Sequence, residues 1–150
     1  MARTILGVIA GYLTMFVAVF LMFTVAYVAL GTDGAFKPGS YDVSGVWIAI
    51  SMVLGLVAAV AGGVVCAAVA RNPKAPILLA VVVIVLGVLL ALPALMSPNG
   101  ESPGIRTGDV GNMEAMSKAK IPAWISLVNP VIGAVGVLIG GGMRRNRQAA

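Results

Sequence analysis

Four long apolar runs, separated by polar segments, dominate the pattern of hydrophobic and polar positions along the chain. Each run has about 20 residues or more without an Asp, Glu, Lys or Arg, the length that an α-helix needs to cross the hydrocarbon of a bilayer. The first run exceeds the hydrophobic part of a signal peptide and no clear cleavage pattern follows it, so we interpret it as a retained helix. The four predicted spans are Ile5–Leu30, Val46–Ala70, Ile77–Met96 and Ala123–Met143.

The composition agrees with this pattern. Of the 150 residues, 60% are apolar and only 10% are charged, whereas a soluble domain is about one quarter charged. A chain of this length cannot bury so much apolar surface in one water-soluble core, so lipid must cover the remainder. The predicted fold class is therefore all-α. Residues 1–150 form a single integral membrane domain, a polytopic bundle of four transmembrane helices.

Charge is distributed unequally among the polar segments, and this predicts the orientation. All charged residues are basic in three segments: the N-terminus, the loop 71–76 and the tail 144–150. The loops 31–45 and 97–122 contain all five acidic residues and the other four basic residues. Basic residues near span ends favour the cytoplasmic side. We therefore expect a multi-pass protein of a plasma membrane, the bacterial cytoplasmic membrane in particular, with both termini and the loop 71–76 in the cytoplasm. The residues that carry this prediction are Arg3, Arg71, Lys74, Arg144, Arg145 and Arg147.

The two predicted outer loops differ in character. The first is rich in turn-forming residues, and we expect its aromatic residues Phe36 and Tyr41 to rest on the lipid headgroups. The second loop contains a segment, Asn112–Lys120, whose pattern predicts a short helix at the outer surface of the membrane. Trp47 and Trp124 each open a span at the outer interface, where amphipathic rings prefer to lie.

Small residues recur at helical spacing in every span, and they predict how the helices pack. In the fourth span, Gly133, Gly136 and Gly140 share one face with two polar residues, and Val137 lies off that face. Lipid tails are as apolar as leucine, so membrane helices associate through close contact at small residues and through hydrogen bonds. The sequence therefore predicts a tight bundle. A similar stripe in the second span comprises Ser51, Gly55, Ala59, Gly62, Cys66 and Ala70.

Asn129 and Pro130 form the polar anomaly of the fourth span. Pro130 cannot donate a backbone hydrogen bond and should bend the helix. In the favoured interpretation the Asn129 amide satisfies a freed backbone group or a neighbouring helix. In the alternative, Asn129 lines a substrate or ion path. The candidate polar and packing site comprises Ser51, Ser126, Asn129, Pro130, Gly133, Gly136 and Gly140.

The residues that are missing narrow the range of functions. The spans contain no ionisable carboxylate of the kind that proton-coupled transporters use, and the chain has no histidine and a single cysteine. We therefore predict no enzymatic activity, no metal, no cofactor and no nucleic-acid partner. The favoured hypothesis is a structural or accessory subunit that binds other membrane proteins, or itself, through small-residue helix faces in the lipid bilayer. The alternative is a small oligomeric channel or passive carrier with a pore near Ser126 and Asn129.

Overall fold

The part of the chain that the structure describes folds into five helices, four of which are long and apolar enough to cross a membrane. The computed structural model describes residues 1–96, 105–106 and 108–149, with only the backbone of residues 94–95 and 145–149. The four predicted spans are confirmed as helices, so the chain is a multi-pass, α-helical membrane protein. The helices are α1 (Ala2–Ala35), α2 (Gly45–Ala70), α3 (Ala75–Met96), α4 (Asn112–Lys118) and α5 (Ala123–Ala149).

Several helix ends differ from the predicted span ends, and α1 and α2 begin earlier, at Ala2 and Gly45. α1 continues past Leu30 to Ala35, but with a break at Gly31, whose φ of 68° is accessible to glycine at little cost. α3 already begins at Ala75, with Pro76 in its first turn, where a missing backbone N–H is tolerated. α5 continues to Ala149, so the predicted tail is helical over 144–149.

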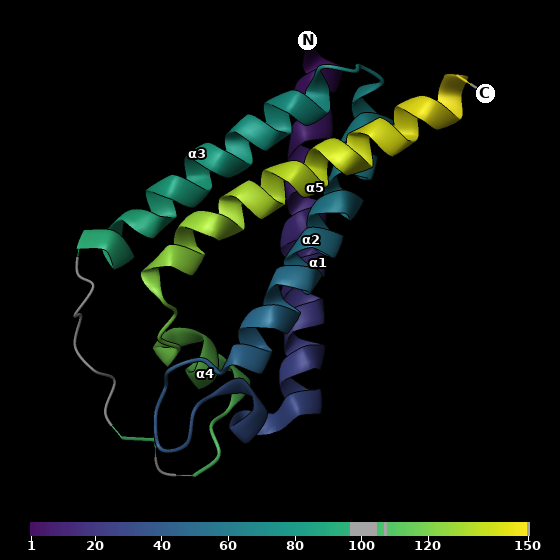
Figure 1. The fold of residues 1–150 in the computed structure, drawn as a ribbon. Coiled ribbons are helices and arrows are strands. Elements are labelled where there is room, and N and C mark those ends of the chain that lie inside the picture. The colour runs from purple at the N-terminus through teal and green to yellow at the C-terminus, as the bar shows by residue number, and fades with distance from the viewer. Residues whose placement is uncertain (97–104, 107, 150) are drawn as a thin grey trace.

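The long helices form two pairs that diverge along the bundle (Figure 1). α2 packs against α1 and α5, and α5 packs against α3, so that α2 and α5 join the two pairs. α3 and α5 run side by side and obliquely to α1 and α2 (Figure 1). Both termini and the turn after α2 lie at one end, called here the terminal end, and α4 lies at the opposite end, the loop end (Figure 1).

The contacts within the bundle are close because small residues face one another. A Cβ atom built on Gly7 of α1 would lie 2.5 Å from the Cβ of Ala70 on α2. One built on Gly136 of α5 would lie 2.6 Å from the Cβ of Ala59. Val137 is fully buried against α2, so its predicted position off the packed face is wrong. The contact face of α5 is wider than the small-residue stripe.

An aromatic cluster closes the loop end. Phe36 and Tyr41 are buried, with 3% and 7% of their surface exposed, so the expectation that they rest on headgroups is wrong. Their ring centroids lie 5.9 Å apart, edge to face. Tyr27 of α1 packs edge to face against both Phe36 and Trp47, at 6.4 Å and 6.0 Å. The rings bury one another because the loop between α1 and α2 folds back over the ends of these helices.

Tyrosine hydroxyls and a short backbone pairing attach the segment 108–120 to this cluster. The Tyr27 hydroxyl donates to the carbonyl of Val110 at 2.7 Å, and the Tyr41 hydroxyl donates to Glu114 Oε1 at 2.9 Å. The amide of Lys120 donates to the carbonyl of Tyr41 at 2.9 Å. These bonds hold α4 against the ends of the bundle. A position of α4 on the membrane surface stays a prediction.

Candidate functional site

The divergence of the two helix pairs leaves a cleft of about 450 Å³ among the four long helices. It lies in the half of the bundle nearer the loop end, beside the early turns of α2 and α5. All four long helices contribute to its lining, which is mainly apolar. The lining includes Tyr12, Met15, Phe23, Ser51, Met52, Gly55, Leu86, Gly87, Ala91, Ser126, Asn129, Pro130 and Gly133.

The structure brings the three polar residues of the predicted site to this one cleft. Ser51 comes from α2, and Ser126 and Asn129 come from α5. The Ser51 hydroxyl donates to the carbonyl of Ile48 in its own helix at 2.8 Å, so its donor is satisfied. It is therefore a weaker candidate for binding a ligand than its exposure to the cleft alone would indicate.

Asn129 behaves differently from the favoured expectation. Its side chain is exposed at the cleft, and it makes no hydrogen bond to any residue that the structure describes. α5 continues without a break through Pro130, so no distorted turn requires the amide. The amide donors and the carbonyl acceptor of Asn129 therefore remain available to a group that enters the cleft.

Pro130 and Gly133 of α5 make the contact with α3 beside the cleft. Pro130 is buried, and its ring lies against Gly87 of α3, where a Cβ atom would not fit. A Cβ atom on Gly133 would lie 3.0 Å from Val83 Cγ1. The ring of Pro130 therefore fills the space above a glycine, which allows these two helices to run side by side.

Gly136 and Gly140 lie between the cleft and the terminal end, where α2 and α5 touch. A Cβ atom on Gly140 would overlap the carbonyl of Val60, and one on Gly63 would overlap the carbonyl of Val137. The two backbones are in direct contact there. The cleft therefore ends at this contact and does not continue between α2 and α5.

The cleft is uncharged, and this limits its chemistry. Its lining contains no carboxylate, lysine, arginine or histidine among the described residues. It therefore offers no acid–base pair and no counterion for a charged substrate. The sequence did not predict the contributions of α1 and α3, such as Phe23 and Leu86. An apolar residue that faces a cleft has the same sequence signal as one that faces lipid.

Comparisons with known proteins supply no relative. No protein-family model matches the chain, and neither a curated protein nor a solved structure matches it. A functional proposal therefore depends on the residues and geometry of the chain itself.

Proposed function

We propose that this protein is an accessory subunit that binds a transmembrane helix of another membrane protein in the cleft between its two helix pairs. The observation that carries the proposal is the exposed amide of Asn129, which no described residue hydrogen-bonds. Lipid tails offer an amide no partner, and polar groups left unpaired in hydrocarbon are costly. A polar group on a second helix would satisfy it, and such bonds between helices stabilise association.

The shape of the cleft supports the same proposal. Small residues allow helix backbones to approach one another closely, and the lining includes Gly55, Gly87, Ala91 and Gly133. A Cβ atom on Gly55 would meet nothing within 4 Å. Gly55 thus presents bare backbone to the cleft, whereas Gly62 and Gly63 of α2 are already in contact with α1 and α5.

The contact between α2 and α5 argues against a conduit through one subunit. A path toward the terminal end between these helices would have to separate Gly140 from Val60 and Gly63 from Val137. Backbone contacts of this kind are the ones that hold membrane helices together. An occupant that stays in the cleft requires no such separation.

The proposed setting is a bacterial cytoplasmic membrane, with the terminal end in the cytoplasm. The support comes from charge. The basic residues of that end are accompanied by no acidic side chain in the sequence, and this distribution is typical of cytoplasmic segments. The proposal includes no catalytic step and no cofactor, because the cleft lining offers no base or carboxylate to perform one.

Copurification with cleft variants tests the proposal. The full chain, extracted in mild detergent from the membranes in which it is native, is expected to bring one membrane protein with it in fixed proportion. Gly55→Leu fills the cleft and should abolish this association. Val53→Leu is the matched control, because Val53 is 61% exposed and lies two residues away, on the opposite side of α2.

Asn129→Leu measures the contribution of the amide. Its loss should weaken the association about threefold, the equivalent of a typical membrane hydrogen bond of about 0.6 kcal/mol. The proposal would be contradicted if Gly55→Leu and Val53→Leu copurified with equal amounts of the partner. It would also be contradicted if the extracted protein copurified with no other membrane protein.

A passive carrier for small uncharged solutes is the second candidate, and the convergence of Ser51, Ser126 and Asn129 on one cleft favours it. Carriers place uncharged polar groups where a solute must leave water. Glycerol flux into proteoliposomes containing only this chain distinguishes the two functions. Flux that falls in Asn129→Leu would establish the carrier and reject the accessory function. Flux equal to that of protein-free vesicles would reject the carrier.

A further inference from the structure

A second cavity, of about 410 Å³, lies at the terminal end of the bundle and is called here the terminal pocket. The last turns of α2 and of the spanning part of α5 form it, together with the turn after α2 and the first turn of α3. It therefore lies where three spans leave the hydrocarbon. Its lining includes Arg71, Asn72, Ile77, Leu138, Gly142 and Arg144.

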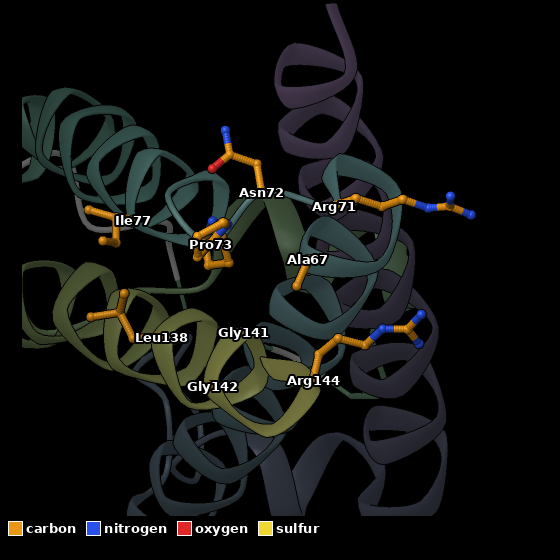
Figure 2. Close-up of a pocket in the computed structure, with 10 residues that line it drawn as sticks. Ala67, Arg71, Asn72, Pro73, Ile77, Leu138, Gly141, Gly142 and Arg144 are labelled. Carbon is orange, nitrogen blue, oxygen red and sulfur yellow. The ribbon is translucent and has the colours of Figure 1, made fainter. Parts of the chain in front are cut away.

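The two arginines point to the same side of the terminal pocket. Figure 2 shows the guanidinium groups of Arg71 and Arg144 extending past Ala67 in the same direction, away from Ile77 and Leu138, so that they lie at the rim of the pocket. Arg71 comes from the end of α2, and Arg144 comes from α5. Tertiary packing thus brings together two positive charges that are far apart in the sequence.

These charges have no counterpart within the part of the chain that the structure describes. Both ion pairs found there lie at the loop end, where they join Arg106 to Asp33 and Lys118 to Glu114. The Nε atom of Arg144 is buried and has no hydrogen-bond partner. A buried donor without an acceptor is unfavourable, so the site calls for an acceptor, and two neighbouring positive charges favour an anionic one.

The opposite end of the terminal pocket is apolar. Ile77 and Leu138 line it, and they are 55% and 45% exposed. A ligand that satisfied the whole pocket would therefore combine an anionic group with a hydrocarbon chain. Guanidinium groups match phosphate oxygens in geometry and charge, and basic pockets between transmembrane helices are known sites for anionic headgroups.

We propose that the terminal pocket binds the phosphate group of an anionic membrane lipid. The phosphate lies between Arg71 and Arg144, and an acyl chain runs along Ile77 and Leu138. The site is separate from the cleft. It requires only that the terminal end meets a headgroup layer, so it holds for either orientation of the chain and whether or not the cleft binds a helix.

The test measures binding of phosphatidylglycerol and of phosphatidylcholine to the purified full chain, by native mass spectrometry at physiological ionic strength. Phosphatidylglycerol should bind selectively. The double variant Arg71→Gln/Arg144→Gln should weaken its binding at least about tenfold, as expected for lost charge-assisted bonds. Gly142→Leu should weaken it with both charges kept, because a Cβ atom there meets nothing within 4 Å and the side chain can occupy the pocket.

The matched control removes two charges from the same end but outside the pocket. Arg3→Gln/Lys74→Gln should change the affinity less than about threefold, because both side chains are exposed and outside the lining of the pocket, where water and ions screen their charges. Equal losses of phosphatidylglycerol affinity in the two double variants would show a diffuse surface effect and overturn the proposed site. Unchanged affinity in Gly142→Leu would show that the lipid does not occupy the pocket, and would also overturn it.

Inorganic phosphate distinguishes the two sources of this chemistry. If the site is built for a lipid, about 10 mM phosphate should leave phosphatidylglycerol bound, because the phosphate ion lacks the chain that Ile77 and Leu138 contact. Displacement by phosphate alone, or thermal stabilisation by phosphate equal to that by the lipid, would assign the pocket to a soluble phosphate and overturn the proposal.

Discussion

Substituting Gly140 by alanine tests whether close backbone contact holds the two helix pairs together. A Cβ atom at this position overlaps the carbonyl of Val60 and lies 3.0 Å from the amide nitrogen of Val64. Both are backbone groups of a continuous helix, so neither can rotate away as a flexible side chain would. The added methyl group must therefore push α5 away from α2.

The expected cost follows from two opposing effects. Overpacking a close contact costs about 1–3 kcal/mol, and the rigid surroundings favour the upper part of that range. Replacing glycine by alanine within a helix returns at most about 1 kcal/mol. Gly140→Ala should therefore lower the free energy of unfolding by about 1–2 kcal/mol.

Gly55→Ala is the matched control, because a Cβ atom at Gly55 meets nothing within 4 Å. This variant should be neutral or more stable by up to about 1 kcal/mol. Reversible unfolding in mixed micelles with a denaturing detergent, followed by tryptophan fluorescence, gives both values. Stabilities of the two variants within about 0.5 kcal/mol of each other would refute the importance of backbone contact at Gly140.

Two further predictions concern the ends of the bundle. In a Cys66→Ala background, a cysteine at Ser40 should react with an impermeant thiol reagent added to intact cells, and one at Gln148 should not; labelling of position 148 would reverse the proposed orientation. Hydrogen bonds from Lys118 and Tyr41 lower the pKa of Glu114, so their contribution is present above the ordinary carboxyl pKa and is lost as the pH falls through the lowered value. Amide exchange at Lys120, corrected for its intrinsic rate, should therefore accelerate as the pH falls below the ordinary carboxyl range, and Glu114→Gln should remove this pH dependence.

The sequence by itself determined the membrane-spanning helices and their approximate bounds. A run of about 20 apolar residues has one stable form in hydrocarbon, because a helix satisfies every backbone group within itself. No tertiary information is needed for this result. A separate helical pattern predicts a short helix over Asn112–Lys120, and α4 spans Asn112–Lys118. Its position at the membrane surface stays a prediction.

The sequence indicated the polar members of the candidate site, but it did not indicate their environment. Helical spacing placed Ser126 and Asn129 on one face of α5, and both line the cleft. The favoured prediction is that the Asn129 amide forms a hydrogen bond with its own helix or with a neighbouring helix. The described residues form no such bond with it. A free amide and a satisfied amide have identical sequence signals, because the difference lies in what other helices place beside them.

Only the tertiary structure decided which surfaces face one another. Val137 is buried beside Gly136, although the small-residue pattern places the two on different faces. Phe36 is buried by aromatic neighbours, although a polar loop surrounds it in the sequence. Arg71 and Arg144 line one pocket although α3, the loop after it and most of α5 separate them in the sequence. In a membrane, lipid solvates an apolar helix nearly as well as another helix does, so hydropathy carries little information about contacts. The close fit of particular residues determines them instead.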